Sequence, residues 1–274
     1  MSQFDLGPFG ERGRAMKCLV PALTVLAAAM SASGEVRTET VKYKLGDVTM
    51  IGYLAWDEAV ASPRPGVLVV HEWYGLNDYA KSRARQLAQL GYLALAADMY
   101  GNGVVATDAA EAGKLATALR EDRPLMRARA REALETLRKN PLCDPQRIAA
   151  IGYCFGGGAV LELARSGADV TGVVSFHGNL DTPNPGDAKN IRAKVLVLHG
   201  ADDPHVNAAQ IANFQQEMRN ANVDWQMIFY GGAVHSFTNP ASGDDPSRGV
   251  AYNAAADRRS WEAMKGFFDE IFKK

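Results

Sequence analysis

The chain has 274 residues, of which 47% are apolar and 22% charged, and its formal net charge is −1. This length suffices for one large α/β domain, and the nearly neutral charge argues against a nucleic-acid surface or a polyanionic partner. The three cysteines (Cys18, Cys143 and Cys154) are too few for a disulfide framework and are not spaced as zinc ligands.

The N-terminus has the pattern of a secretory signal. Basic residues up to Lys17 precede an apolar run over 18–30, and small residues follow at 31–34. This order is typical of a cleaved signal peptide, and the run is shorter than the about 20 residues of a transmembrane helix. A buried N-terminal helix is the alternative. We expect residues 1–34 to be an N-terminal extension with a signal starting at Met16, and the mature protein to be secreted or periplasmic without a membrane anchor. If the signal is not used, the protein is cytoplasmic.

Strands and helices alternate along the rest of the chain. Val36–Lys44 and Val48–Trp56 predict an antiparallel hairpin turned at Gly46-Asp47. The short apolar run Val67–Val70 is typical of a strand buried on both faces of a parallel sheet. Further strands are expected at 92–97, 147–152, 170–176, 194–198 and 225–229, and helices at 77–90, 107–119, 125–139, 155–166, 208–220 and 255–272. This alternation predicts one α/β domain over 35–274, with a mainly parallel sheet covered by helices on both faces.

The basic residues are scattered along the chain rather than gathered into a patch. The densest group consists of Arg127, Arg129 and Arg131, inside an expected helix. Alternating charges of this kind are typical of the solvated face of a helix, which is how we interpret them.

The segment Gly152–Gly158 (GYCFGGG) joins an expected strand to an expected helix. It has the G-x-nucleophile-x-G pattern of a nucleophile elbow, with cysteine in place of serine. Such a turn exposes Cys154 above the sheet at a helix N-terminus, where the helix dipole favours a thiolate. The N–H of Phe155 is then free to serve in an oxyanion hole. The alternative is that Cys154 is a buried structural thiol.

A nucleophile of this kind needs a base and an orienting acid, in the chain order nucleophile, acid, histidine. The expected strand that ends at Leu198 is followed by a loop with Asp202 and Asp203, and a later glycine loop precedes His235. We assign His235 as the base and Asp203, rather than Asp202, as the acid that orients its imidazole. For His71 and His199 we favour the interpretation of hydrogen-bonded residues that border the core.

The segment His71-Glu72-Trp73-Tyr74-Gly75 follows the first buried strand. In this architecture the other half of the oxyanion hole lies there, and the N–H of Trp73 is the natural donor. A carboxylate at this place costs free energy unless it is paired or solvated. We expect Glu72 to tune a neighbouring proton transfer, and a surface loop residue is the alternative.

Together these motifs resemble the dienelactone hydrolase family. The resemblance runs from about Val48 to Lys274 and rests on VVHEWYGLN, GYCFGG, HGADDP and the His-Ser-Phe segment, in that order. It implies a compact α/β-hydrolase fold without a large cap domain, and a triad of Cys154, His235 and Asp203. It further implies that Glu72 interacts with the thiol and helps to generate the thiolate when substrate arrives.

One feature of the family is missing from the sequence. Relatives that open dienelactone hold the substrate carboxylate with arginines, but neither Met99–Gly103 nor Ser236–Asn239 contains an arginine. Asparagine does not replace the bidentate charge recognition of an arginine. The resemblance therefore implies the hydrolytic chemistry and leaves the substrate open. We expect Tyr100 and Phe237 to contact it.

The sequence thus predicts a hydrolase that cleaves an ester or lactone through a thioester on Cys154. We expect no metal, no organic cofactor and no nucleic-acid partner, and we favour a monomer. One alternative is a non-catalytic exported binding protein on the same fold. Another is a thiol redox protein that uses Cys143 and Cys154, although the strand between them makes a disulfide geometrically difficult.

Overall fold

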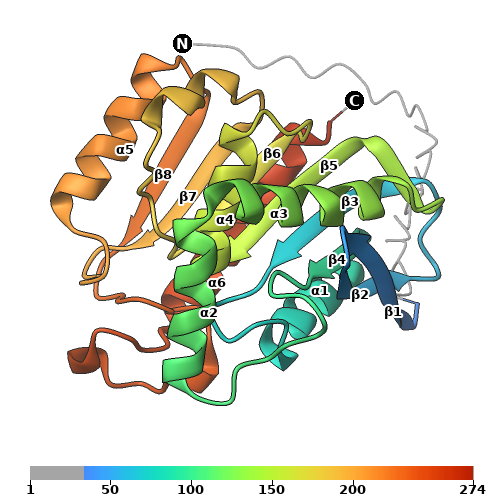
Figure 1. Cartoon of the computed structure of the whole chain (residues 1–274), viewed down its shortest axis with the longest axis horizontal. Coiled ribbons are helices and arrows are strands. Elements are labelled where there is room, and N and C mark those ends of the chain that lie inside the picture. Colours follow the sequence, from blue (N-terminus) through green and yellow to red (C-terminus); the bar gives the residue numbers. More distant parts are fainter. Residues whose placement is uncertain (1–33, 274) are drawn as a thin grey trace, which may run out of the picture. The chain divides into compact units, whose positions relative to one another are not determined.

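The computed structural model describes residues 34–273. Within this part of the chain, eight strands form one sheet in the order β1-β2-β4-β3-β5-β6-β7-β8 (Figure 1). The strands are β1 (Val36–Leu45), β2 (Val48–Asp57), β3 (Arg64–Val70), β4 (Leu93–Ala97), β5 (Cys143–Tyr153), β6 (Gly172–Phe176), β7 (Lys194–Gly200) and β8 (Trp225–Tyr230). Strands β3 to β8 are parallel, and the hairpin β1-β2 joins them antiparallel through β4. Residues 34–273 thus have the α/β-hydrolase fold expected from the sequence, and this part of the chain contains no large cap domain.

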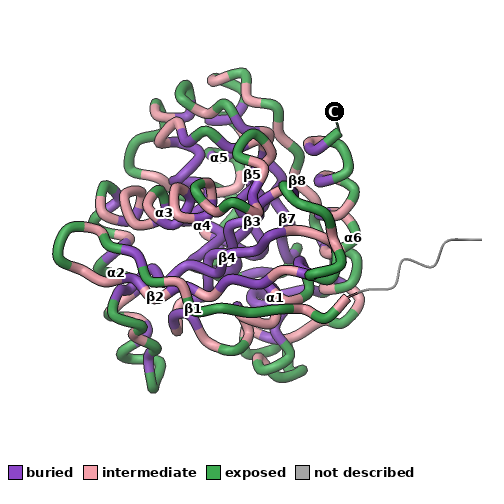
Figure 2. The backbone as a smooth tube through the Cα atoms, turned by 90° about the vertical axis from the view of Figure 1, so that its right-hand side faces the viewer, coloured by how far each residue is buried: buried purple, intermediate pink, exposed green. Residues whose placement is uncertain are grey.

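Helices cover both faces of the sheet. The helices are α1 (Asp78–Gln89), α2 (Ala109–Glu121), α3 (Arg123–Arg138), α4 (Phe155–Arg165), α5 (Ala208–Asn220) and α6 (Ala254–Ile271), with short 3-10 turns η1 (Pro185–Asn190), η2 (Pro240–Ser242) and η3 (Pro246–Arg248). Apolar residues of α1 and α6 form one core with one face of the sheet, and those of α2 to α5 form a second core with the other. Figure 2 shows that the central strands lie in the buried interior while the helices expose their outer sides.

The expected elements are present, and most of their ends agree with the pattern of the sequence. The hairpin turns at Gly46-Asp47, with Leu45 paired to Val48. Strand β5 begins earlier than expected, at Cys143, because Arg64 and Pro65 pair with the residues before the apolar run. This first part of β5 is polar and contains a proline, so alternation alone does not identify it.

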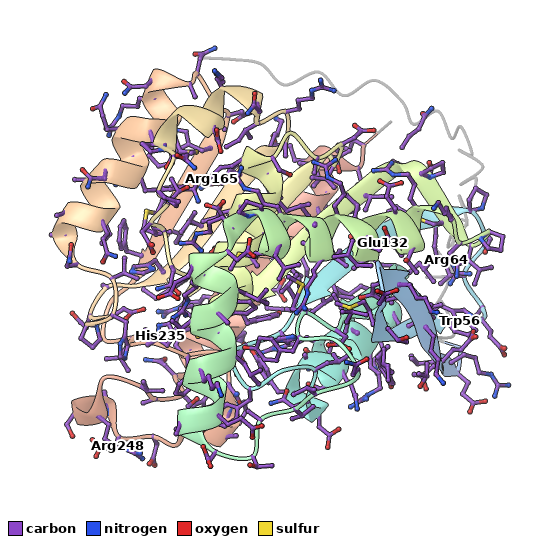
Figure 3. All side chains as sticks on the ribbon, in the orientation of Figure 1. Trp56, Arg64, Glu132, Arg165, His235 and Arg248 are labelled. Atoms are coloured by element: carbon purple, nitrogen blue, oxygen red, sulfur yellow. The ribbon has the colours of Figure 1, made fainter. Side chains whose placement is uncertain are left out.

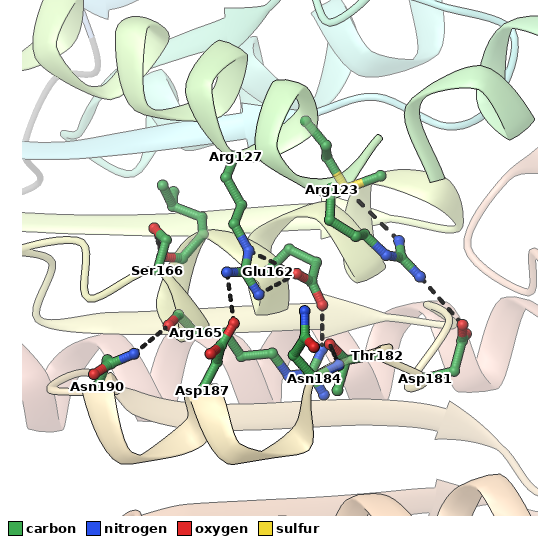
Figure 4. A network of polar contacts seen from close by, with 12 residues as sticks. Arg123, Arg127, Glu162, Arg165, Ser166, Asp181, Thr182, Asn184, Asp187 and Asn190 are labelled. Atoms are coloured by element: carbon green, nitrogen blue, oxygen red, sulfur yellow. Dashed lines mark hydrogen bonds and ion pairs between the residues drawn. The ribbon is translucent and has the colours of Figure 1, made fainter. Parts of the chain in front are cut away.

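The prediction for the clustered arginines of α3 was wrong for Arg127 and Arg129, which are partly buried against other elements, whereas Arg131 is exposed as expected. Arg127 lies 2.7 Å from a carboxylate oxygen of Glu162, which is fully buried (Figure 4). Arg129 donates to the carbonyl oxygens of Met99 and Tyr100, and Arg131 donates to Ser166. Their partners come from distant parts of the chain, so a local charge pattern could not reveal them.

The signal-peptide prediction falls on residues 1–33, which lie outside the described residues, and it stays a prediction. Between residues 34 and 273 no helix combines the length and the apolar character needed to cross a membrane.

Candidate active site

Cys154 lies at the sharp turn between β5 and α4, on the edge where the parallel strands end. Its backbone has φ 52° and ψ −115°, a conformation that a residue other than glycine rarely adopts. The turn is tight because a Cβ at Gly152 would lie 2.0 Å from the carbonyl oxygen of Gly156. The strain is held by the N–H of Cys154, which donates both to the Phe176 carbonyl at 3.0 Å and to His177 Nδ1 at 3.1 Å.

The side chains of Cys154, His235 and Asp203 form a hydrogen-bonded line. His235 Nε2 lies 3.0 Å from Cys154 Sγ, and Nδ1 lies 2.8 Å from Asp203 Oδ2. The second oxygen of Asp203 accepts the N–H of His205 at 2.8 Å. Asp202 instead points away and accepts the N–H of Gly232. The structure therefore brings together the three residues selected from the sequence, and it places Asp203 rather than Asp202 against the imidazole.

The charges within this line support one another. Burial disfavours the charged imidazole, but Cys154 and Asp203 outweigh it and raise the pKa of His235 to about 10. Burial also opposes the charge on Asp203, yet the hydrogen bond and the charge of His235 lower the pKa of that carboxyl group. A protonated His235 beside the sulfur is the arrangement that stabilises a thiolate.

Two backbone N–H groups expected at the oxyanion hole are free to bind substrate. Phe155 is the first residue of α4, so its N–H has no partner within the helix. Trp73 lies in the turn after β3. Among the described residues, no acceptor is found for either N–H.

Glu72 is buried beside the site, but it does not contact the thiol. Ser236 Oγ donates to Oε1 and Asn239 Nδ2 donates to Oε2, each at 2.6 Å. In this arrangement each carboxylate oxygen accepts from a neutral donor, and the contact with Cys154 that the family resemblance implies on arrival of substrate stays a prediction. Burial raises the pKa of Glu72 despite these two hydrogen bonds.

Of the two residues expected to contact substrate, Tyr100 and Phe237, only the first lies beside the nucleophile. The Tyr100 hydroxyl donates to the carbonyl oxygen of Trp73 at 2.6 Å, and Cys154 contributes to a raised pKa of this hydroxyl, after burial. Phe237 is fully buried against His177 and Tyr230. The prediction for Phe237 was therefore wrong, because its ring supports the site from the core.

The two histidines interpreted as core residues behave differently. His71 binds the carbonyl of Glu72 through Nδ1 and accepts the N–H of Met99 through Nε2, as a buried histidine should. His199 is 1% exposed, but neither of its ring nitrogens has a hydrogen-bond partner among the described residues. The expected burial of His199 is confirmed, and its expected hydrogen bond is not made.

Sequence reasoning did not single out His177, which lies directly against the line of three residues. Its ring is 0% exposed and its centroid is 5.4 Å from that of His235. It also accepts the N–H of Cys154. The sequence feature that could have identified His177 is its position directly after an expected strand, in the run Phe176-His177-Gly178. Residues that follow the strands of a parallel sheet meet at one edge of that sheet.

Arg120, near the end of α2, also escaped the sequence analysis. Its Nη2 donates to Asn179 Oδ1 at 2.8 Å. Asn179 packs on the first turn of α4, since a Cβ at Gly158 would lie 3.5 Å from the Asn179 Cβ. Within residues 34–273, Arg120 has no carboxylate partner, whereas Arg123 pairs with Asp181 at 3.1 Å. A guanidinium without a carboxylate partner therefore lies near the first turn of α4, which begins directly after Cys154.

Cys143 lies far from this site. It begins β5 and Cys154 follows the end of that strand, which puts the two cysteines roughly 30 Å apart along an extended chain. Both are free thiols, and burial raises the pKa of Cys143 to about 11. The geometry excludes a disulfide between these two cysteines.

Comparisons with known proteins agree with this fold. A family model described as the dienelactone hydrolase family matches residues 50–272. A solved structure named m3DLH is 46% identical, with a TM-score of 0.85, and covers 88% of this chain and 100% of its own. A dienelactone hydrolase-like promiscuous phosphotriesterase from metagenomic libraries is also 46% identical, with a TM-score of 0.83 and the same coverage. An uncharacterized protein of Caenorhabditis elegans is 39% identical over 150 residues, covering 54% of this chain and 94% of its own.

Proposed function

The chain belongs to the dienelactone hydrolase family, and from this premise we propose that it hydrolyses its substrate through a thioester acyl-enzyme on Cys154. Its class as a carboxylic ester or lactone hydrolase follows from the family. The observation that carries the proposal is the line from Cys154 through His235 to Asp203, with separations of 3.0 Å and 2.8 Å. In this proposal the three residues act as nucleophile, acid-base and orienting carboxylate.

The reaction proceeds in two steps. The Cys154 thiolate attacks the carbonyl carbon, a C–S bond forms, and the negative charge on oxygen is bound by the N–H groups of Phe155 and Trp73. The carbon–oxygen bond then breaks, and protonated His235 gives its proton to the leaving oxygen. In the second step His235 takes a proton from water, the hydroxide attacks the thioester, and the acid and the thiolate are released. Asp203 holds the imidazole in place throughout.

Thiolates are good nucleophiles and also good leaving groups. Activated esters, such as aryl esters and enol lactones, should therefore react faster than plain alkyl esters. The binding-protein alternative finds no support, because the comparisons place the chain in a family of hydrolases.

The proposal is tested by mixing the full chain with p-nitrophenyl acetate and following both nitrophenolate release and intact mass. We expect a burst of about one equivalent of nitrophenolate per active site, together with the mass of one acetyl group. Peptide mapping should locate this group on Cys154. Turnover without an adduct on Cys154, under conditions that trap the intermediate at low pH, would contradict the thioester mechanism.

We further propose that Arg120 binds a carboxylate of the substrate, in place of the arginines missing from the two family positions. Helix α2 stands at the edge where the parallel strands end (Figure 1), and His235, which Figure 3 labels, lies in the loops at that edge. A Cβ at Gly113 would lie 3.9 Å from the ring of Trp73. Arg120 is seven residues further along α2, which is two helical turns and the same face. This face therefore borders the site, with the Arg120 guanidinium at one end.

The electrostatics around Arg120 are consistent with this role. The pKa of Tyr100 is raised by burial and by Cys154, and Arg120 opposes that increase. The pKa of His205 is lowered by burial and by His235, and Arg120 lowers it further. Its charge thus acts on two groups of the site, Tyr100 and His205, and its remaining N–H donors suit a carboxylate.

This preference is measured by comparing an anionic and a neutral substrate. The quantity compared is kcat/KM for the anionic mono-p-nitrophenyl glutarate, divided by kcat/KM for the neutral p-nitrophenyl butyrate. We expect Arg120→Gln to lower the ratio by about tenfold or more, since a hydrogen bond to a charged group contributes about 1.5–3 kcal/mol. Lys114→Gln removes the same charge from an exposed position on another face of α2, and it should leave the ratio within twofold. An unchanged ratio in Arg120→Gln would refute the role of Arg120.

A further inference from the structure

His177 makes hydrogen bonds to two different segments of the site. Its Nδ1 accepts the backbone N–H of Cys154 at 3.1 Å. Its Nε2 lies 2.7 Å from Thr238 Oγ1, and Thr238 follows His235 by three residues in the same loop. One imidazole therefore connects the turn that carries the nucleophile to the loop that carries the base.

These contacts determine the protonation state of His177. Because Nδ1 accepts an N–H, it carries no proton, and Nε2–H is then the donor to Thr238. Burial, and after it the charge of His235, hold the pKa of His177 well below its usual range. The His177 ring thus stays neutral beside a protonated His235. A positive charge on His177, at a ring separation of 5.4 Å, would destabilise the protonated form of His235.

Both ends of this connection are held firmly. His177 has φ 39° and is enclosed by Phe237, whose ring centroid lies 5.1 Å away. Thr238 Oγ1 lies 2.5 Å from the hydroxyl of Tyr79, and the Thr238 carbonyl accepts Arg83 Nη2 at 2.6 Å. Arg83 is in turn paired with Asp257 of α6 at 2.6 Å. The loop that carries His235 is thereby anchored to α1 and α6.

We propose that His177 is a positioning residue that sets the separation between Cys154 Sγ and His235 Nε2 by bridging their two backbone segments. This inference rests on the proposed function, in which Cys154 is the nucleophile. His177 does not touch the reacting atoms. It acts by holding the strained turn and the loop of His235 in one relative position, and misplacement of reacting groups by about 1 Å can cost on the order of 100-fold in rate.

Two pairs of variants separate this role from simple packing. Thr238→Val keeps the shape of the side chain but removes the hydroxyl that Nε2–H binds, whereas Thr238→Ser keeps the hydroxyl. His177→Leu removes both hydrogen bonds, whereas His177→Asn retains an acceptor close to the position of Nδ1 and tolerates a positive φ. In each pair the conservative variant should restore function if the hydrogen bonds matter.

The first readout is kcat with p-nitrophenyl acetate, expressed per active site from the burst amplitude. We expect kcat to fall by about tenfold in Thr238→Val and by about 30-fold or more in His177→Leu, with KM little changed, since positioning acts on the chemical step. Thr238→Ser should stay within threefold of the natural chain, and His177→Asn should recover part of the loss. A residue that only fills space would lower the fraction of folded enzyme but not kcat per active site. Equal kcat per site in all four variants would overturn the proposal.

The second readout does not require turnover. Iodoacetamide alkylates Cys154 as the thiolate displaces iodide, and mass mapping distinguishes this from reaction at the other cysteines. We expect slower alkylation of Cys154 at neutral pH in His177→Leu and Thr238→Val, because the sulfur loses its alignment with protonated His235. If the natural chain shows no burst, the proposed function fails, and the alkylation rates still decide the role of His177. Unchanged alkylation rates in both variants would then overturn it.

Discussion

Replacing Cys154 with alanine should lower kcat/KM for p-nitrophenyl acetate by about 10⁴-fold, a loss of the size seen when members of such triads are removed. Alanine fits the site, because the strained backbone is held by hydrogen bonds from the main chain of Cys154 and not from its side chain. The variant should therefore fold as the natural chain does, and the burst should disappear. Residual activity would come from the oxyanion donors alone.

The serine variant distinguishes the chemistry of the sulfur from its position. Cys154→Ser keeps a nucleophile of similar size, but a hydroxyl does not form the charge pair with His235 that the sulfur supports. We expect a loss of about 10²-fold or more, since general acid-base assistance contributes about 10²–10⁴-fold. We also expect a lower pKa of His235, because the charge of Cys154 raises it in the natural chain. Retention of more than half of the activity in Cys154→Ala would contradict the proposed nucleophile. Circular dichroism and melting temperature should verify that both variants are folded.

The order of the elements and the location of the site could be predicted because the relevant signals are local. A strand that is buried on both faces has a continuous apolar pattern, and an elbow needs glycines on both sides of the nucleophile. The assignment of Asp203 over Asp202 used the same kind of local reasoning, and in the structure Asp203 binds the imidazole at 2.8 Å. The parallel sheet then brings residues from separate strand ends to one edge.

What the sequence did not reveal depends on partners that are distant along the chain. Glu72 is bound by Ser236 and Asn239, which lie more than 160 residues away. The three arginines of α3 follow a charge pattern typical of a solvated surface, but Arg127 reaches the buried Glu162 of α4. Phe237 follows the base by two residues, yet a turn of the loop sends its ring into the core. Each of these outcomes depends on how distant elements pack against one another. A local sequence pattern does not give their relative positions.

Asp203→Asn should be the most damaging change that leaves the nucleophile and the base in place. An asparagine retains the shape but cannot stabilise a positive charge on His235, and its amide can bind the wrong tautomer of the ring. We expect kcat/KM to fall by about 10²–10³-fold, less than the about 10⁴-fold loss for the equivalent change in a serine triad, because a thiolate is intrinsically the better nucleophile. Asp202→Asn is the matched control, since its carboxylate is exposed and binds Gly232 rather than the imidazole, and it should stay within threefold.

The pH dependence gives this prediction a second test with a definite sign. The pKa of His235 is raised to about 10, and Asp203 contributes to this increase. The imidazolium is thus present below about pH 10, and the protonation of an alkyl leaving group is lost as the pH rises through that value. Removing the Asp203 charge lowers the pKa of His235, so the decline of kcat/KM for an alkyl ester should move to lower pH. NMR titration of the His235 ring protons should follow the same shift. An unshifted pKa of His235 in Asp203→Asn would mean that Asp203 only orients the imidazole. The sulfur of Cys154 alone would then stabilise the positive charge on His235.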